Sequence, residues 1–252
     1  GDWSSDVCSS DLALMADLCR RLGVAPGQVS QDGRVSVAAT SCTGLGDQGP
    51  AALVNHHHVF TRLDAARIAE MADLIRRDVP PAQWPAAWSA VDNTVRRAEV
   101  LLATPPAPGT ALAAALARGP EAMLAEVEAS RLRGRGGAGF STGQKWRACR
   151  DAPGAEHVVV CNADEGEPGT FKDRLILTDF PELVFAGMAI AGRAVGAEFG
   201  ILYLRAEYGW LRDHLETALE QCRARNVLGN AILGAKDFNF EISRSEEHTS
   251  EL

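Results

Sequence analysis

The feature that most constrains the fold is a regular alternation of strand-type and helix-type segments after residue 116. Apolar strand-type runs occupy His157–Cys161 and Phe199–Arg205, and a third begins with "DFNFEI" at Asp237. Helix-type segments at Phe180–Val195 and Tyr208–Arg225 separate these runs. Strands joined by crossover helices run parallel, and such crossovers are right-handed. The pattern therefore predicts an α/β fold with a parallel sheet, in which "HVVVC" forms a buried strand.

Residues 13–79 follow a different pattern, which predicts the C-terminal half of a small α+β domain. A helix at Ala13–Leu22, a strand at Arg34–Ala39 and a hairpin within "AALVNHHHVFTRL" precede a closing helix. An apolar stripe at helical spacing runs along that closing helix: Ala66, Ile68, Met71, Leu74 and Ile75. The prolines of residues 80–115 punctuate helices and predict a linker, after which residues 116–243 form the second domain.

The two ends, residues 1–12 and 244–252, do not read like native protein. They match translations of opposite strands of one common sequencing-adapter oligonucleotide, so we expect both to be adapter-derived and to lie apart from the core. On this expectation the gene is cut at both ends. Six acidic residues and one arginine lie in these segments, so the 25 basic and 33 acidic residues of the chain become 24 and 27. The formal net charge then changes from −8 to −3.

The corrected charge and the remaining composition exclude several classes of protein. A near-neutral chain carries no nucleic-acid footprint. The longest apolar stretch, "LVFAGMAIAG", is too short to span a bilayer, so we expect no membrane insertion. The near-neutral charge and the scattered cysteines fit a reducing compartment, so we expect a cytoplasmic location, which includes the cytoplasmic side of a membrane complex. No CxxC spacing joins the five cysteines between the ends, so we predict neither a disulfide framework nor a metal site. These cysteines are Cys19, Cys42, Cys149, Cys161 and Cys222.

The histidine run at His56–His58 could suggest a metal site, but its position argues against one. It lies at the tip of the expected hairpin, where neighbouring strand residues face opposite sides. Three adjacent imidazoles there are therefore poorly placed to bind one metal ion. We interpret the run as a solvated turn.

A glycine-rich loop, "RLRGRGGAGFSTGQKW" at Arg131–Trp146, lies between two helix-type segments. It contains a GxGxxG pattern, spelled by Gly134, Gly136 and Gly139. A helix precedes this pattern where the dinucleotide-binding fingerprint requires a strand, so the loop is of another kind. Its bare backbone amides, together with Arg133, Arg135 and Lys145, suit an anion such as phosphate. A purely structural turn is the alternative interpretation.

A second polar loop, "CNADEGEPGTFKD" at Cys161–Asp173, follows the first predicted strand. Ligands of parallel sheets bind beyond the carboxyl ends of the strands, so this loop is well placed. Asp164, Glu165 and Glu167 repel phosphate, but they accept hydrogen bonds from a flavin ring N–H, ribityl hydroxyls or a carboxamide. A basic glycine loop and an acidic strand-end loop together suit a nucleotide cofactor. A solvated acidic loop with a Pro-Gly turn is the alternative.

These two loops and a third stretch, "ILYLRAEY", resemble the flavoprotein family that binds flavin and NADH in respiratory complex I. They resemble even more closely its relatives in NAD-reducing hydrogenases and NAD-dependent formate dehydrogenases. The resemblance covers about residues 116–243 and implies a Rossmann-like domain that binds FMN and NAD(H). The family's later motifs, including the cysteines of its 4Fe-4S cluster, fall outside this chain.

The resemblance also implies roles for individual residues. The glycine-loop contacts match Gly134, Gly136 and Lys145. The flavin contacts of the acidic loop match Asn162, Asp164 and Glu165. Positions lining the NADH side match Arg135, Gly137, Phe140 and Glu167.

In the first region, "SCTGLGDQGPAALV" resembles the thioredoxin-like 2Fe-2S domain that is fused ahead of this flavoprotein in hydrogenase diaphorase subunits. The family's cluster pattern there is CxxxC. Here Cys42 is followed four residues later by Gly46, which cannot ligate iron. We therefore expect residues 13–79 to lack a 2Fe-2S cluster, and this departure favours the fused diaphorase of the hydrogenase type.

The resemblance implies an NADH dehydrogenase or diaphorase module. It would move hydride between NAD(H) and FMN and pass electrons to iron–sulfur clusters in partner subunits of a multisubunit oxidoreductase. The cofactor carries this chemistry, so we expect no catalytic side chain and no protein-bound metal here, and the fragment alone should be inactive. The alternatives are the β subunit of an NAD-dependent formate dehydrogenase, a complex I flavoprotein subunit, and a non-catalytic scaffold derived from the same fold.

Overall fold

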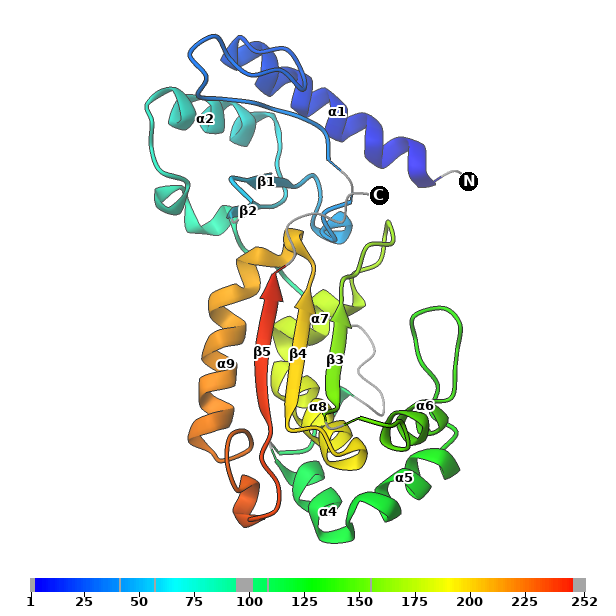
Figure 1. Ribbon diagram of the computed structural model, residues 1–252. Helices are drawn as coiled ribbons and strands as arrows, with labels where there is room; N and C mark the ends of the chain where they lie inside the picture. The colour runs from blue at the N-terminus through cyan, green and yellow to red at the C-terminus, as the bar shows by residue number, and fades with distance from the viewer. Residues whose placement is uncertain are drawn as a thin grey trace. The chain divides into compact units, whose positions relative to one another are not determined.

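The computed structural model describes residues 3–40, 42–56, 58–93, 102–107, 109–154 and 156–246 (Figure 1). The chain divides into two compact units. The first unit contains Gly1–Thr94, Glu165–Lys172 and Glu207–Trp210. The second unit contains Val95–Asp164, Asp173–Ala206 and Leu211–Leu252. The division therefore runs through the acidic loop.

Two helices and a hairpin build the first unit. They are α1 (Trp3–Leu22), β1 (Ala52–Val54), β2 (His58–Phe60) and α2 (Ala65–Arg76). The hairpin is antiparallel and pairs Leu53 with Val59. Asp64 caps α2, because its side chain accepts a hydrogen bond of 2.8 Å from the backbone N–H of Arg67. The closing helix predicted from the apolar stripe is confirmed.

Aromatic side chains form the core of the first unit. Phe60 and Trp84 stack with their ring centroids 4.7 Å apart, and Trp88 meets Phe60 edge-on at 6.4 Å. The indole N–H of Trp84 donates to the carbonyl of Val79 at 2.9 Å. Both tryptophans come from the proline-rich stretch that the sequence assigned to a linker. The prolines begin the short 3-10 helices η2 (Pro81–Gln83) and η3 (Ala86–Trp88), and these helices deliver the two rings to the core.

The strand predicted at Arg34–Ala39 does not form. Ser36 alone makes a β-bridge, with Val29. The backbone N–H of Ser30 donates to the carbonyl of Val35 at 2.8 Å, and the N–H of Val35 donates to Ser30 Oγ at 3.0 Å. The segment therefore folds back on the turn that precedes it and pairs with no strand among the described residues.

A three-stranded parallel sheet organises the second unit. Its strands are β3 (Val158–Ala163), β4 (Phe199–Leu204) and β5 (Glu241–Glu246), in the order β3-β4-β5. The connections contain α8 (Pro181–Val195) and α9 (Arg212–Ala224). The other α-helices in the described part of the unit are α4 (Thr110–Arg118), α5 (Pro120–Ala129), α6 (Thr142–Arg150) and α7 (Lys172–Asp179), which also lies between β3 and β4 along the chain. The predicted α/β fold with a parallel sheet is confirmed.

The central helix α8 packs closely against the sheet. It begins with Pro181 in its first turn and ends at Gly196, whose φ of 81° is left-handed. A Cβ on Gly192 would lie 2.4 Å from the ring of Phe240, so only glycine fits there. Among the described residues, no single helix is long and apolar enough to cross a membrane, and α7 and α8 meet that test only as a pair bent by 97°.

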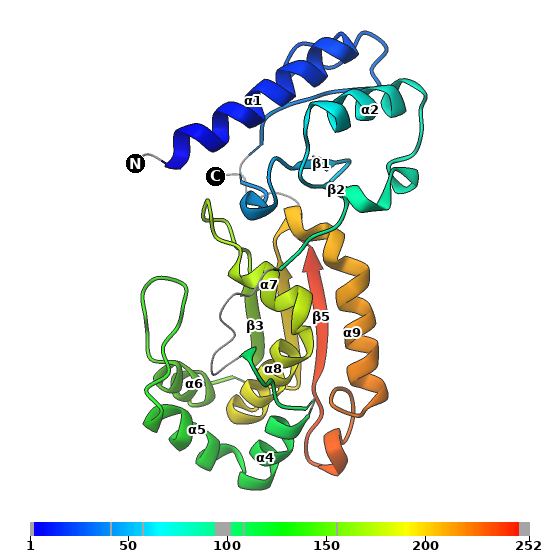
Figure 2. The same cartoon turned by 180° about the vertical axis from the view of Figure 1, so that it is seen from behind.

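Two predictions about the second unit need correction. The expected helix Tyr208–Arg225 begins as a 3-10 helix, η4 (Ala206–Leu211), and becomes α-helical only at Arg212. The strand predicted to be buried is exposed on one side, since the side chains of Val158 and Val160 are 44% and 58% exposed. The reason is that α8 covers only one face of the sheet: it lies behind the strands in Figure 1 and in front of them in Figure 2.

Secondary structure extends into both end segments. The helix α1 begins at Trp3, although Asp11 and Leu12 are exposed and the first buried side chain described in it is Leu18. At the other end β5 continues to Glu246, and Arg244 pairs with Leu202 of β4. The expectation that the C-terminal segment lies apart from the core is therefore wrong for residues 244–246. Backbone groups hold a strand ladder, so the ladder can extend whatever the side chains are.

Candidate functional site

The glycine loop of the second unit is a hairpin-like arch between α5 and α6. A β-bridge joins Arg133 to Ser141, and the backbone N–H of Gly134 donates to the carbonyl of Phe140 at 2.9 Å. These contacts close the base of the arch. Residues 135–138 form its tip, and all of them are exposed.

The glycines of the tip leave space that the protein itself does not fill. A Cβ on Gly136 or Gly137 would meet no atom within 4 Å. Gly137 has a φ of +106°, which L side chains rarely adopt, whereas Gly136 is not in that region. By contrast, a Cβ on Gly143 in α6 would lie 2.8 Å from the Cα of Glu128. The tip therefore offers open backbone to a ligand, as phosphate binding requires.

The cations around this loop fall into two groups. Arg147 donates to Glu121 at 2.8 Å and to Glu128 at 3.1 Å, and these hydrogen bonds raise the pKa of its guanidinium. It is thus committed to holding α6 against α5. Arg135 and Lys145 are exposed, and the structure gives neither of them an ion pair within the described residues. Arg133 is also exposed, and its guanidinium donates to the carbonyl of Gly139 at 3.2 Å, not to an acid. The charges of these three residues are therefore available to an anion.

The structure also places an aromatic side chain beside the tip. The side chain of Phe140 is 60% exposed. It borders a concavity of about 490 Å³ whose lining residues are Glu128, Arg131, Arg133, Ala138, Gly139, Phe140, Ser141 and Gln144. An exposed ring next to an open backbone arch provides a stacking surface for a planar group.

The carboxyl end of β3 brings Asn162 and Asp164 together. The backbone N–H of Asp164 donates to Asn162 Oδ1 at 3.0 Å, which is an Asx-type turn. Asn162 is exposed and Asp164 is half-buried. The turn directs the chain out of the strand and leaves the carboxylate of Asp164 partly accessible as a hydrogen-bond acceptor.

Glu165, in the first unit, is placed differently from the other acids of the loop. It is only 2% exposed, and the hydroxyl of Tyr208 donates to its Oε2 at 2.8 Å. Lys172 Nζ lies 3.6 Å from Oε1. Both carboxylate oxygens therefore have partners within the protein. Sequence reasoning missed Tyr208 and Lys172, although the "EY" that follows β4 was part of the quoted family stretch.

Glu167 lies on the exposed part of the same loop. Its carbonyl accepts a hydrogen bond of 3.1 Å from the N–H of Thr170, which closes the turn that contains Gly169. Gly169 has a φ of +79°, so the predicted Pro-Gly turn is present. The carboxylate of Glu167 is thus presented to solvent at the crest of this turn.

The cysteines and histidines described next lie at positions where a side chain packs in the protein or forms a turn. Burial, together with the nearby charge of Asp173, raises the pKa of the Cys161 thiol to about 11. Burial also raises the pKa values of Cys19 and Cys222. His56 has a left-handed φ of 62° at the hairpin tip, while His57 lies outside the described residues. The described residues contain no group of three or more potential metal ligands.

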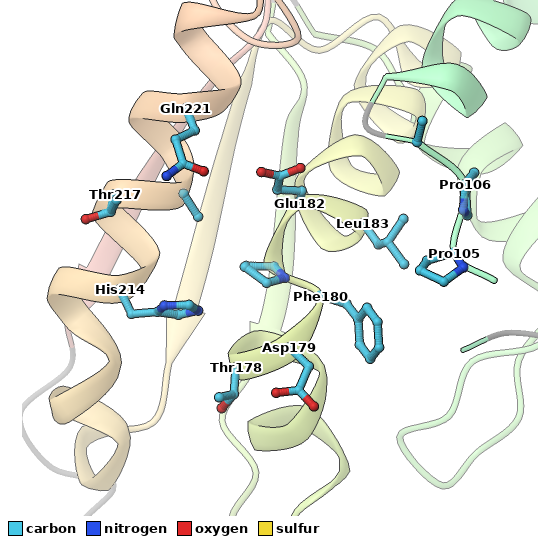
Figure 3. A pocket seen from close by; sticks show the side chains of 13 residues that line it. Pro105, Pro106, Thr178, Asp179, Phe180, Glu182, Leu183, His214, Thr217 and Gln221 are labelled. Atoms are coloured by element: carbon cyan, nitrogen blue, oxygen red, sulfur yellow. The ribbon is translucent and has the colours of Figure 1, made fainter. Parts of the chain in front are cut away.

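A second concavity, of about 430 Å³, lies between the first turn of α8 and the side of α9 (Figure 3). Phe180 and Leu183 contribute its apolar wall, and His214 and Gln221 project from α9. None of the site residues predicted from the sequence lines it. The predicted residues gather instead on the glycine loop and on the loop after β3.

Comparisons with known proteins identify the class to which this fold and these loops belong. Residues 127–248 match the Nuo51 FMN-binding domain, and residues 4–76 match the thioredoxin-like 2Fe-2S ferredoxin. Both loops lie within the first of these matches. Residues 127–248 belong to the family of the Nuo51 FMN-binding domain.

Two relatives show which members of this class the chain resembles. The chain is 41% identical over 242 residues to the NAD-reducing hydrogenase HoxS subunit alpha of Cupriavidus necator, a match that covers 91% of this chain and 40% of that protein. It is 45% identical over 132 residues to an NADH-quinone oxidoreductase subunit of Aquifex aeolicus, covering 52% of this chain and 30% of that protein.

A solved structure agrees with the first of these relatives. The crystal structure of an NAD+-reducing NiFe-hydrogenase in the air-oxidised state matches with a TM-score of 0.82 and 44% identity. This match covers 96% of the present chain and 41% of that one. The chain thus spans about two fifths of the length of the relatives that it matches along both of its regions.

Proposed function

We propose that the protein to which this chain belongs oxidises NADH, or reduces NAD+, with FMN as its cofactor. The observation that carries this proposal is the FMN-binding match over residues 127–248, which includes both the open glycine tip and the carboxyl end of β3. The match to the hydrogenase protein runs through both regions of the chain, whereas the match to the NADH-quinone oxidoreductase protein covers about half. We therefore favour the hydrogenase type of diaphorase over the complex I type.

The residues present suit a ligand that carries phosphate. The glycine tip is open backbone that a Cβ would fill, and Lys145 beside it has no acid to neutralise it among the described residues. We assign the FMN contacts of the glycine loop to Gly134, Gly136 and Lys145. When bound, FMN supplies hydride exchange with NAD(H) and single-electron exchange with iron–sulfur clusters.

The chain's own contribution is to bind and orient. Backbone amides at the tip donate to phosphate oxygens, and the Lys145 ammonium offsets their charge. Asn162 would donate or accept hydrogen bonds at polar edges of the cofactor, Asp164 would accept them, and Glu165 stiffens the loop from within. We assign Arg135, Gly137, Phe140 and Glu167 to the NAD(H) side. None of these side chains needs to act as a general acid or base.

The proposal extends to partners and location. Relatives of the chain are named as subunits of a hydrogenase and of an NADH-quinone oxidoreductase, so we propose iron–sulfur electron-transfer subunits as partners, in the cytoplasm. We further propose that the first region holds no 2Fe-2S cluster, because Gly46 stands where CxxxC requires a ligand. Iron and the visible absorption of such a cluster in the purified first domain would contradict this.

The test of the main proposal uses the full-length protein. We expect it to release FMN on denaturation and to reduce ferricyanide with NADH. Full-length protein that folds but contains no flavin and shows no NADH oxidation would establish a non-catalytic scaffold instead. Flavin without NADH oxidation would retain the cofactor assignment and exclude the reaction.

A further inference from the structure

A buried hydrogen bond joins the acidic loop to the segment that follows β4. Tyr208 is fully buried, and Glu165 is nearly so. The Tyr208 hydroxyl donates to Glu165 Oε2 at 2.8 Å, and Lys172 Nζ lies 3.6 Å from Oε1. A hydrogen bond to a carboxylate is stronger than one between neutral groups, and burial removes the water that would compete for it. This bond therefore holds the Glu165 side chain in one place.

The backbone of Gly44 lies directly against the same tyrosine. Gly44, Tyr208 and Glu165 all belong to the first unit. A Cβ on Gly44 would lie 2.1 Å from the hydroxyl oxygen of Tyr208 and 2.6 Å from Cε1 of its ring. Gly44 is itself buried, and its φ is +71°. The hydroxyl therefore has room to reach Glu165 only because residue 44 carries no side chain.

Gly44 lies in the stretch that resembles the loop of a 2Fe-2S domain. It is two residues from Cys42 and two residues from Gly46, which cannot ligate iron. A Cβ on Gly46 would meet no atom within 4 Å, so the two glycines of this loop differ. The contact with Tyr208 gives the loop a role that does not depend on a cluster, because its backbone supports the buried hydrogen bond.

Glu165 is the anchor of an otherwise accessible loop. From residue 164 to residue 172, all of which the structure describes, it is the single buried residue, and residues 166–169 are exposed. Asp164 directly precedes it, and Glu167 follows two residues later. A loop that is fixed by one side chain has fewer conformations to lose when a ligand binds, so it binds that ligand more tightly.

We propose that Tyr208 is a positioning residue for the acidic loop, because its hydroxyl, supported by the backbone of Gly44, fixes Glu165. The fixed loop holds Asp164 and Glu167 in the conformation that meets the cofactors. This inference rests on the proposed function, which assigns Asp164 to FMN and Glu167 to NAD(H). Tyr208 acts through Glu165 and not on a reacting atom.

The first test uses Tyr208→Phe in the full-length protein, which removes the hydroxyl and keeps the ring. The flavin-free protein is titrated with FMN under conditions in which wild type and variant are both folded. We expect the dissociation constant for FMN to rise roughly tenfold and the visible circular dichroism of the bound flavin to change. A tyrosine with a merely structural role would lower the melting temperature and leave both of these measurements unchanged.

The second test compares two glycines with the same backbone strain. Gly44 and Gly33 have φ values of +71° and +74°, but a Cβ on Gly33 would meet no atom within 4 Å. We expect Gly44→Ala to weaken FMN binding as Tyr208→Phe does. Gly33→Ala should bind FMN like wild type, and so should Gly46→Ala, the control within the same loop. If Gly44→Ala or Tyr208→Phe does not fold, the other variant decides.

The outcomes separate this inference from the proposed function. A folded wild-type protein that does not bind FMN would overturn the proposed function and this inference with it. A wild-type protein that binds FMN, with Tyr208→Phe and Gly44→Ala equal to it in affinity and circular dichroism, would overturn this inference alone. Equal weakening in Gly33→Ala and Gly44→Ala would also overturn it, because backbone strain and not the contact with Tyr208 would then be the cause.

Discussion

The glycine loop and the acidic loop differ in whether their groups have contact or hydrogen-bond partners within the protein. At the tip of the glycine loop, a side chain on Gly136 or Gly137 would touch nothing. In the acidic loop, Glu165 is buried and held by Tyr208 and Lys172. Residues of the two family motifs therefore serve different purposes. Groups without partners inside the protein, such as the backbone of the glycine tip, are free to bind a ligand. Groups that have such partners, such as Glu165, stabilise the loop that carries the ligand-binding groups.

The largest effect is expected at the satisfied acid. Glu165→Ala leaves the buried hydroxyl of Tyr208 without its acceptor, and we expect a loss of about 3 kcal/mol in the free energy of unfolding. The matched control is Glu167→Ala, an exposed acid of the same loop, which should stay within about 0.5 kcal/mol of wild type. Urea denaturation of both variants provides the measurement. Equal stabilities of the two variants would erase the distinction between the buried acid and the exposed acid of this loop.

Asp164 tests the opposite case, an acid left partly accessible. Asp164→Ala should lower flavin content while unfolding remains close to wild type, because it removes an acceptor for cofactor donors rather than an internal contact. The loss of one charged hydrogen bond costs about 1.5–3 kcal/mol, or roughly ten- to a hundredfold in affinity. Fluorescence of flavin released from the denatured full-length protein reports the change. A variant that loses stability but keeps its flavin would assign Asp164 to the scaffold.

Two glycines of the same stretch of chain allow the same comparison, because one faces open space and the other packs against the protein. Gly136→Ala adds a Cβ into open space, so we expect unchanged stability and roughly tenfold weaker flavin binding. Gly143→Ala brings a Cβ against the backbone of Glu128 and should cost about 1–3 kcal/mol of stability. Gly137→Val should also weaken FMN or NADH binding, although its left-handed φ adds strain. Thermal unfolding and flavin content, measured side by side, separate the two kinds of glycine.

The smallest effect is expected at Glu167. Glu167→Gln keeps the size of the side chain and removes its charge, so flavin content and stability should stay unchanged. The KM for NADH in the ferricyanide assay should shift by roughly a fewfold, which corresponds to less than about 1 kcal/mol. A change in flavin content without a change in KM would move Glu167 from the NADH side to the flavin side.

Sequence reasoning recovered those features that local patterns encode. The helix-type segments that form α8 and α9 and the apolar runs of β3 and β4 are short-range signals, and they predicted the parallel sheet. Exposure of Val160 was not predictable, because a strand's own residues do not show whether a second layer is present. The Tyr208–Glu165 hydrogen bond joins residues that are 43 positions apart, so no local pattern contains it.

The prediction that the proline-rich stretch is a linker was wrong at Trp84 and Trp88 for a related reason. Prolines mark where helices end, but they do not show whether the residues between them are buried. Trp84 and Trp88 therefore belong to a core although their neighbours read as a linker. The structure shows the conformations of the candidate site residues and their hydrogen-bond partners within the protein. Their contacts with the cofactor are predictions.

The position of Cys161 in β3, directly before Asn162, has a consequence for oxidative chemistry. A thiol whose pKa is about 11 is ionised in roughly one molecule in ten thousand at neutral pH. Peroxides and alkylating agents attack the thiolate, so they reach this sulfur only slowly. The strand that leads to the proposed flavin contacts thus carries a sulfur that resists both sulfenic acid formation and covalent trapping.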